Sequence, residues 1–308
     1  MSAVTEPRIS IIIPTFARPA KLRACLDAIA HLDFDRDAFE TIVVDDGSPA
    51  PIDGILADFE DRLAVRVVRQ QRAGPGPARN AGAHVARGRY LAFLDDDCAP
   101  APDWLAVMVR ELDRDDRQLL GGRVVNALPD NPYAVASDDI TNFVYDYYRL
   151  GVARERFFTT GNIALAARFF HTLGGFTTAI PSATAEDKEF CDRWCARGLA
   201  LTHVPAAVVY HTHDLTLRSF LRQHFNYGRG ILSFRLLRRA RAKGLLVPEP
   251  LRFYSDLVTS PLRQRGPHRW RAVALLTASQ LATAAGALYE AAPAVARRLT
   301  GRNGRAGA

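Results

Sequence analysis

The sequence predicts an α/β protein with a mainly parallel central sheet and flanking helices, extended at its C-terminal end by a basic helical region. Short apolar runs alternate with helix-compatible stretches along the first hundred residues, which is typical of a doubly wound sheet. Acidic and turn residues directly follow several of these runs. Hydrophobic residues make up 48% of the 308-residue chain and charged residues 24%, as in an ordinary globular protein.

The expected strands and helices follow one another in a regular order. The β-branched run 9–13 is stopped by a proline and predicts a strand buried on both faces. Leu22, Leu26 and Ile29 share one side of a helix expected over 20–30. Further strands are expected at 41–44, 65–68, 90–94 and 200–209, and further helices at 78–86 and 185–197. Because ligands of such sheets bind beyond the carboxyl ends of the strands, the residues there are the candidate site.

Charge divides the chain into two parts. Residues 211–308 contain 17 Lys+Arg and 4 Asp+Glu, whereas the rest of the chain contains 23 Lys+Arg and 29 Asp+Glu. We expect a first domain over 1–215, with halves at 1–100 and 101–215, followed by a helical basic region at 216–308. Such a basic region attracts phospholipid surfaces or nucleic acid. No nucleic-acid motif accompanies these arginines, so no nucleic-acid partner is expected.

Within the basic region, residues 272–292 carry a single charge, on Glu290. The run is long enough to span a bilayer, but it is rich in alanine and contains threonine, serine and glutamine. Three arrangements stay open. The helix packs on the catalytic domain, lies on a membrane surface with arginines at its flanks, or spans the membrane.

Three adjacent carboxylates, Asp95, Asp96 and Asp97, follow the strand expected at 90–94. They repel one another unless a cation or solvent screens them. In an extended segment Asp95 and Asp97 point the same way, which offers two oxygens to a hard cation such as Mg²⁺ or Mn²⁺. The alternative is an acidic turn in which Asp103 caps the next helix.

Two weaker signals lie near other strand ends. Asp45 and Asp46 follow the second strand, where carboxylates could hold a base or a ribose, although Asp-Gly is also a common turn. A Gly/Pro-rich segment at 74–77 precedes Arg79 and Asn80. Its backbone could approach a phosphate, with Arg79 supplying charge.

Four motifs together give a specific resemblance. They are Ser10-Ile11-Ile12-Ile13-Pro14-Thr15-Phe16-Ala17-Arg18, Val43-Val44-Asp45-Asp46-Gly47-Ser48, Gly76-Pro77-Ala78-Arg79-Asn80-Ala81-Gly82 and Phe93-Leu94-Asp95-Asp96-Asp97. In this order and spacing they resemble the nucleotide-binding half of the family 2 glycosyltransferases. The resemblance covers roughly the first two hundred residues.

The resemblance implies that 1–215 is a catalytic domain of GT-A fold, with a nucleotide-binding half at 1–100 and an acceptor half at 101–215. The donor site would lie at the strand ends. The residues expected to bind the donor are Pro14, Thr15, Arg18, Asp45, Asp46, Arg79, Asn80, Asp95, Asp96, Gly161 and Asn162. Asp95 and Asp97 would form the family's DXD motif and bind a divalent cation, Mn²⁺ or Mg²⁺. His211 would be a further metal ligand, with His213 as the alternative. A hydrogen-bonded core histidine is the structural explanation that competes with this role for His211.

The acceptor side is expected in the helix over 185–197. Glu186 and Asp187 lie where a helix N-terminus stabilises carboxylates, so a solvated first turn would also explain them. They match the acceptor-site acidic pair of the family, which implies that Asp187 is the general base. Glu186 and Trp194 would then contact the acceptor. A base on the face opposite the leaving diphosphate inverts the anomeric configuration.

The sequence therefore predicts an inverting, metal-dependent glycosyltransferase. By resemblance, the donor is a nucleoside-diphosphate sugar, UDP-linked first, and the acceptor a hydroxyl of a glycan, glycolipid or lipid-linked molecule in cell-wall or polysaccharide biosynthesis. A noncatalytic nucleotide-sugar-binding protein and a nucleotidyltransferase are the alternatives. Four cysteines and a short polar stretch at 1–8 favour a cytoplasmic location, peripheral on the inner face of the cell membrane.

Overall fold

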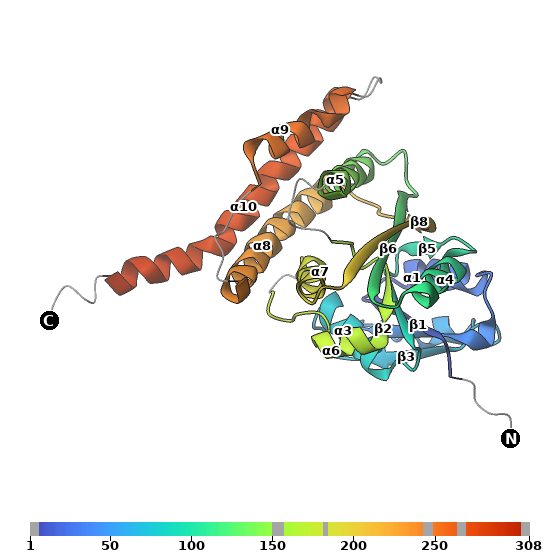
Figure 1. The fold of residues 1–308 in the computed structure, drawn as a ribbon. Helices are drawn as coiled ribbons and strands as arrows, with labels where there is room; N and C mark the ends of the chain where they lie inside the picture. The colour runs from blue at the N-terminus through green and yellow to red at the C-terminus, as the bar shows by residue number, and fades with distance from the viewer. Residues whose placement is uncertain (1–5, 150–156, 181–183, 243–248, 264–268, 303–308) are drawn as a thin grey trace. The chain divides into compact units, whose positions relative to one another are not determined.

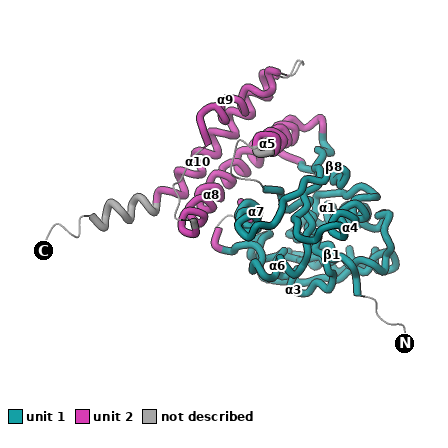
Figure 2. The backbone as a smooth tube through the Cα atoms, in the orientation of Figure 1, with its two compact units in different colours: residues 1–128, 148–178, 187–213 teal, residues 129–147, 179–186, 214–308 magenta. Residues whose placement is uncertain are grey.

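The chain folds into two compact units. A computed structural model describes residues 6–149, 157–180, 184–242, 249–263 and 269–302 (Figure 1). Unit 1 comprises residues 1–128, 148–178 and 187–213, and unit 2 comprises residues 129–147, 179–186 and 214–308 (Figure 2). Unit 2 therefore contains two segments that precede the expected boundary at 215, in addition to the basic C-terminal region.

Unit 1 is built on an eight-stranded sheet with the order β3-β2-β1-β4-β7-β6-β8-β5. The strands are β1 Ile9–Thr15, β2 Phe39–Asp45, β3 Val65–Arg69, β4 Tyr90–Leu94, β5 Cys98–Pro100, β6 Gln118–Asn126, β7 Asn162–Ala166 and β8 Ala200–His211. The pairs β1–β2, β1–β4, β2–β3 and β6–β8 are parallel. The pairs β4–β7, β6–β7 and β5–β8 are antiparallel. Most of these pairings are parallel, which confirms the predicted fold class.

Helices cover both faces of this sheet. They are α1 Pro19–Ala30, α2 Asp53–Ala57, α3 Pro75–Val85, α4 Trp104–Arg114, α6 Ala167–Leu173 and α7 Glu186–Ala196, with a 3₁₀ turn η1 at Arg36–Ala38. The predicted inner face of α1 is confirmed, because Leu22, Leu26 and Ile29 are all buried. The strands and helices expected at the sequence level all form, with ends shifted by a few residues.

The central strand β1 contributes to two separate cores. Ile9, Ile11 and Ile13 pack in the cluster that includes residues of α1 and α4, whereas Ile12 packs in the cluster that includes residues of α3 and α7. Successive side chains of a strand point to opposite faces, so one apolar run supports both layers. The approach of α3 is close, because a Cβ on Gly82 would lie 2.6 Å from the Ile12 side chain. Helix α3, which begins within the Gly/Pro-rich segment, is thereby held close to β1.

Four phenylalanines form an aromatic cluster beside β4. Phe93 of β4 lies 5.2 Å, centroid to centroid, from both Phe170 and Phe176. Phe190 of α7 completes the cluster at 5.0 Å from Phe176 and 5.3 Å from Phe170. Tilted and edge-on pairs at these distances add stabilisation beyond the burial of area. The cluster joins α6 and α7 to the strand that carries the acidic triplet.

Unit 2 is helical in its described part. It contains α5 Pro132–Arg149, α8 Leu217–Ala242, α9 Leu251–Thr259, a 3₁₀ turn η2 Ser260–Arg263 and α10 Arg269–Arg302. Its core includes Phe220, Phe253, Leu257 and Leu276. Figure 1 shows α8 and α10 side by side, and two glycines set their spacing. A Cβ on Gly228 would lie 1.9 Å from the Thr283 carbonyl oxygen, and a Cβ on Gly286 would lie 1.8 Å from that of Phe225.

Only one side of α10 is covered within unit 2. Leu276, Ser279 and Gly286 are buried, whereas Leu281 and Leu288 have 68% and 72% of their surface exposed. By length and composition Arg269–Ala292 could cross a membrane, and 17% of that window is buried. The apolar run is therefore a helix packed on α8 along one face, with an open face opposite.

Removal of one ring from the aromatic cluster should be costly. The variant Phe93→Ala should lower the free energy of unfolding by about 3 to 5 kcal/mol, because it removes buried contacts and leaves a cavity next to β4. Chemical denaturation followed by tryptophan fluorescence measures the change. The variant Leu281→Ala, at an exposed position, is the control and should change the free energy of unfolding by less than about 0.5 kcal/mol. Equal stability of Phe93→Ala and the native chain would contradict this account of the cluster.

Candidate active site

Three strands of unit 1 end at the same edge of the sheet. Thr15 is the last residue of β1 and Asp45 the last residue of β2, and the two lie opposite each other in a parallel ladder. β4 pairs in parallel with β1 on its other side and runs directly into Asp95. Carboxyl ends of parallel strands meet at one edge, so the predicted donor residues are brought together there.

The two acids after β2 are engaged with the neighbouring loop. Asp45 is fully buried and accepts hydrogen bonds from the Ser48 N–H at 2.9 Å and from Arg69 Nε at 3.1 Å. Asp46 accepts a hydrogen bond from Gln70 Nε2 at 2.7 Å. It also accepts from the backbone N–H groups of Ala73 and Gly74, both at 2.8 Å. Asp46 therefore fixes the loop that enters α3. Its role in this structure is to position the donor edge.

The three acids after β4 have three different environments. Asp95 is partly exposed and forms an ion pair with Arg79 at 2.6 Å. Asp96 is fully buried, accepts from Thr15 Oγ1 at 2.7 Å, and has an oxygen 3.2 Å from Arg18 Nη1. Desolvation raises the pKa of Asp96 to about 6, although Arg18 and Thr15 oppose the shift.

Of the three acids, Asp97 has the most basic side chains around it. Its carboxylate lies 2.8 Å from Arg18 Nη1, 3.2 Å from Lys21 Nζ and 3.3 Å from His211 Nε2. Burial opposes ionisation, but the hydrogen bond and charge of His211, followed by Arg18 and Lys21, lower the pKa of Asp97 well below its ordinary range. Asp97 is therefore a carboxylate at neutral pH.

The two histidines after β8 differ. His211 and His213 stack with ring centroids 4.7 Å apart. Burial disfavours the charged form of His211, yet its hydrogen bond to Asp97 prevails and raises its pKa. Burial and the neighbouring His211 lower the pKa of His213 to about 4. His211 is thus the histidine that the fold directs at Asp97.

The expected metal ligands are only partly brought together. One oxygen of Asp97, Cys98 Sγ and one nitrogen of His211 all lie within 4.8 Å of one another, and this is the group that the described part of the chain offers. Asp95 is not in this group but is paired with Arg79. The two carboxylates have different partners here, because the chain turns after Asp95, and a cation shared by Asp95 and Asp97 stays a prediction.

The residues present fit a hard divalent cation. A carboxylate oxygen and an imidazole nitrogen face each other, and both donor types suit Mn²⁺, while Mg²⁺ prefers the oxygen. Arg18 and Lys21 now balance the charge of Asp97. Asp97 and His211 would hold the ion, and the two basic side chains would then be released toward an anionic ligand.

Several predicted donor residues have structural roles. The amide of Asn80 exchanges two hydrogen bonds of 2.8 Å with the backbone of Phe176. The buried amide of Asn162 bonds the carbonyls of Arg123 and Ala207 and accepts from Trp104 Nε1 at 2.8 Å. In this structure both amides therefore hold the backbone around the site, and their contact with a donor stays a prediction.

Gly161 and Pro14 contribute through their shape. A Cβ on Gly161 would lie 2.9 Å from Asp95 Oδ2, so a larger residue there would displace the Asp95 carboxylate. Pro14 is buried in β1 directly before Thr15, where it pairs with Val44. Both residues lie at the predicted edge.

The residues predicted for the acceptor side differ in how far they are exposed to solvent. Asp187, in the first turn of α7, is partly buried and accepts from the Lys188 N–H at 2.7 Å. Desolvation raises its pKa, although Lys188 and Arg79 oppose the shift. Glu186 is buried. Trp194 is also fully buried, and its indole N–H donates to the Ala200 carbonyl, so it has no surface with which to contact an acceptor.

Lys21 and Cys98 belong to the site but were not among the predicted residues. Lys21 lies one helical turn after Arg18, and this spacing places both on the same side of the α1 N-terminus. Cys98 directly follows the acidic triplet, and its pKa is raised well above its ordinary range by burial and by the acids beside it. Both were visible as neighbours of predicted residues.

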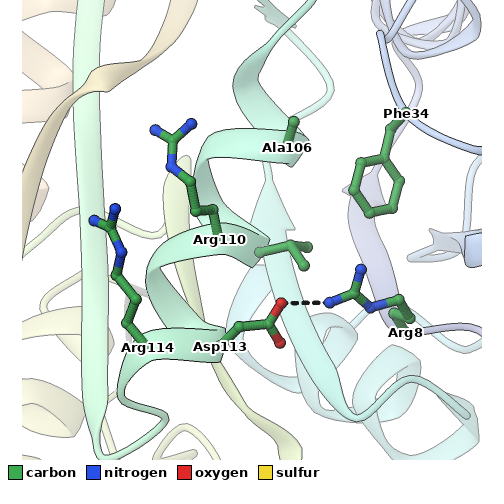
Figure 3. A pocket seen from close by; sticks show the side chains of 7 residues that line it. Arg8, Phe34, Ala106, Arg110, Asp113 and Arg114 are labelled. Carbon is green, nitrogen blue, oxygen red and sulfur yellow. Dashed lines mark hydrogen bonds and ion pairs between the residues drawn. The ribbon is translucent and has the colours of Figure 1, made fainter.

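A separate pocket of about 390 Å³ lies away from this edge (Figure 3). It is lined by Arg8, Phe34 and residues of α4, among them Arg110, Asp113 and Arg114. Arg8 is ion-paired with Asp113, and Arg114 with Glu111. Because Arg8 precedes β1, the pocket lies at the opposite end of that strand from Thr15. It is lined by three arginines and one aspartate, lies away from the acidic triplet, and is not the candidate active site.

Comparison with known proteins agrees with this geometry. The profile of the family described as "Glycosyl transferase family 2" matches residues 10–173, which is more than half of the chain. The chain belongs to glycosyltransferase family 2. The match includes β1, β2, β4 and the acidic triplet, so the resemblance seen in the four motifs is confirmed.

Relatives of this family 2 member include much longer proteins. It is 29% identical to hyaluronan synthase of Pasteurella multocida and 30% identical to chondroitin synthase of Escherichia coli, in each case over 66% of the chain. It spans only 24% and 34% of their respective lengths. Glycosyltransferase AglE of Haloferax volcanii is 25% identical, with 76% of both proteins covered.

Solved structures support the predicted GT-A fold of this family 2 member. The mannosyltransferase PcManGT from Pyrobaculum calidifontis, in complex with GDP-Man and Mn²⁺, superposes with a TM-score of 0.59 at 21% identity, covering 95% of this chain and 81% of that one. S. aureus TarS 1–349 in complex with UDP-GlcNAc superposes with a TM-score of 0.52 at 16% identity, with 90% of both chains covered. At these identities the likeness shows the fold alone.

Loss of Asp97 should disable metal-dependent nucleotide binding. The variant Asp97→Ala should weaken binding of UDP or GDP in the presence of Mn²⁺ by more than about tenfold, since even residues that only orient metal ligands contribute roughly 10- to 100-fold. Thermal-shift titrations with and without Mn²⁺ measure it, because a ligand of the folded state raises stability by mass action. The control variant Asp113→Ala alters an ion pair at the other end of β1. Unchanged Mn²⁺-dependent binding by Asp97→Ala would place the metal elsewhere.

Proposed function

We propose that this chain is an inverting, metal-dependent glycosyltransferase that moves a sugar from a nucleoside diphosphate to an acceptor hydroxyl. One observation carries the proposal. Arg79 forms an ion pair with Asp95 of the acidic triplet and also acts electrostatically on Asp187. The acidic triplet and a carboxyl of raised pKa therefore share one neighbour, Arg79, near the strand ends of a GT-A sheet. Perturbed carboxyls beside a charged cleft edge are typical of catalytic sites.

The donor is proposed to be a nucleoside-diphosphate sugar, with UDP as the first candidate nucleoside diphosphate and GDP as the second. The solved complexes with UDP-GlcNAc and with GDP-Man and Mn²⁺ support this class. The cofactor is proposed to be Mn²⁺ or Mg²⁺, held by Asp97 and His211. When bound, such an ion stabilises the negative charge that develops on the departing diphosphate.

The basic side chains at the edge would bind and orient the diphosphate. Arg18 and Lys21 both lie within 3.2 Å of Asp97. The Arg18 side chain is about half exposed and that of Lys21 about a third exposed, so both can turn toward phosphate oxygens. Arginine and lysine contacts of this kind neutralise the negative charge that develops on a diphosphate as it leaves. Asp96, buried beneath them, keeps Thr15 and the end of β1 in place.

Asp187 is proposed to be the general base. Its carboxylate accepts the proton of the acceptor hydroxyl while the hydroxyl oxygen forms the new bond to the anomeric carbon. The bond between that carbon and the diphosphate oxygen breaks on the opposite face, and the electron pair leaves with the nucleoside diphosphate. Attack and departure on opposite faces invert the anomeric configuration. Glu186, next to Asp187 in the chain, is proposed to influence acceptor binding.

The variant Asp187→Asn should fold and keep Mn²⁺-dependent nucleotide binding but lose about 10²- to 10⁴-fold in transfer rate, because the amide cannot accept the proton. Release of nucleoside diphosphate from a panel of nucleotide sugars and acceptors measures transfer. Asp192→Asn, in the same helix, is the matched control and should retain the rate. Near-native turnover by Asp187→Asn would remove Asp187 as the base.

The same assay carries a pH signature. A base works deprotonated, so the rate should be full above the pKa of Asp187 and fall as pH decreases through it. Because desolvation raises that pKa, the fall should occur at higher pH than for an ordinary aspartate. The residual rate of Asp187→Asn should lack this acid limb.

The acceptor is proposed to be a glycan, glycolipid or lipid-linked molecule at a membrane surface. Exposed positions of α10 recur every three or four residues and form an open stripe along the helix: Trp270, Ala274, Thr277, Leu281, Ala284 and Leu288. Helix α8 contains seven arginines and no acidic residue. An apolar stripe with basic neighbours complements an anionic lipid surface. The inner, cytoplasmic face of the cell membrane is the proposed location, because that leaflet carries anionic lipids.

Vesicle binding tests the membrane proposal. The chain should co-sediment with phosphatidylcholine vesicles that contain phosphatidylglycerol and much less with phosphatidylcholine alone. The double variant Leu281→Glu/Leu288→Glu should lose this binding, because two carboxylates would enter the apolar stripe. The control Ala50→Glu/Ala57→Glu adds the same charge at exposed positions of unit 1 and should bind as before. Equal sedimentation of both double variants would remove α10 as the contact.

A further inference from the structure

Cys98 lies inside the candidate metal site without a role in the proposed reaction. Its Sγ, one oxygen of Asp97 and one ring nitrogen of His211 are mutually within 4.8 Å. The thiol is buried, and a Cβ on Gly161 would lie 3.7 Å from Sγ. The sulfur is thus held in the wall of the site, close to both proposed ligands.

Backbone pairing fixes this arrangement. Cys98 and His211 are direct partners in the antiparallel ladder between β5 and β8. The next residue, Thr212, donates its N–H to the Asp97 carbonyl at 2.8 Å. Three potential ligands therefore come from two paired segments of main chain. Their proximity follows from the sheet and not from a chance side-chain rotamer.

The three donor atoms differ in chemical softness. A carboxylate oxygen suits Mg²⁺ and Mn²⁺, an imidazole nitrogen suits most transition metals, and a thiolate selects thiophilic ions such as Zn²⁺. Ligands that share one zinc at about 2.0 to 2.3 Å lie roughly 3.3 to 3.8 Å apart. The three atoms lie at most 4.8 Å apart here, so a bound Zn²⁺ would draw them together by roughly 1 Å. Mg²⁺ and Mn²⁺ gain little from sulfur.

We infer that Asp97, Cys98 and His211 form a three-ligand site for Zn²⁺ that overlaps the proposed activating-metal site. On binding, the Cys98 sulfur bonds to the ion and the thiol proton passes to solvent. Zn²⁺ would then exclude Mn²⁺ from Asp97 and His211. Zinc binding stands on the geometry alone, and only the consequence, inhibition of the metal-activated reaction, rests on the proposed function.

Co²⁺ is the probe, because it replaces Zn²⁺ in such sites and a cobalt–thiolate bond gives charge-transfer absorption in the near ultraviolet. The full chain, titrated with Co²⁺ in excess Mg²⁺, should show this band with a stoichiometry of one. Added Zn²⁺ should abolish it. The band should disappear in Cys98→Ser, with a loss of Zn²⁺ affinity of more than about 100-fold, and Mn²⁺ affinity should change by less than about threefold.

Two cysteine variants serve as controls. Cys25 is a buried thiol outside the three-residue group, and Cys195 is an exposed thiol on α7. Cys25→Ser and Cys195→Ser should both keep the band. Absence of the band in the native chain, or its persistence in Cys98→Ser, would overturn the inference, as would its loss in either control.

Mn²⁺-dependent binding of UDP and GDP, measured on the same samples, separates this inference from the proposed function. A cobalt–thiolate band without nucleotide binding would support the zinc site and count against the proposed donor site. Nucleotide binding without the band would do the reverse.

Discussion

Strand β1 between β2 and β4 is the constraint on which the rest of unit 1 depends. Its isoleucines fill both cores, so its position and register are fixed from two sides. The parallel ladders on either side then decide which residues meet. Thr15 faces Asp45 in one direction, and the end of β4 delivers the acidic triplet in the other. The hydrogen bond between Thr15 and Asp96 joins the two ends directly.

Charge at this edge is balanced but not symmetrical. Asp97 has three positively charged or chargeable neighbours, Asp95 has Arg79, and Asp96 is buried with a raised pKa. A free carboxylate cluster would be unfavourable, and here protein cations screen it. In the proposed reaction a divalent ion would take the place of these basic side chains at Asp97, and the side chains would then contact the diphosphate. The structure thus describes a site whose internal ion pairs can be replaced by ligand contacts with little change in net charge.

Much of this could be predicted from the sequence, for identifiable reasons. Apolar runs such as 9–13 and 90–94 have one physical explanation, burial in a sheet, and the acids that follow them must then lie at its edge. The partners of amide side chains are harder to predict from sequence. Asn80 and Asn162 could each bind a ligand or a backbone carbonyl, and only the fold decides between them. The strands β6 and β7 were not predicted. Gly121 and Gly122 interrupt the pattern of β6, and a Cβ on Gly121 would overlap the Phe158 ring, a contact from outside the strand.

The different surroundings of Asp95 and Asp97 also could not be predicted from the sequence. An extended backbone would place both carboxylates on one side, but the chain turns after Asp95, where the Cys98 N–H donates to the Asp95 carbonyl. A turn and a strand of three residues cannot be distinguished by periodicity. Trp194 illustrates a related limit, because a tryptophan in an amphipathic helix can face a ligand or a core.

The loop between β3 and α3 depends on Asp46. Both of its carboxylate oxygens are occupied, one by Gln70 and the Ala73 N–H and the other by the Gly74 N–H. An exchange of this loop between members of the family therefore has to consider both the loop and the acid at position 46. A transplanted segment of 70–74 keeps its conformation only if it presents a side-chain donor and two main-chain donors at the same places, or if the acid after β2 is replaced with it.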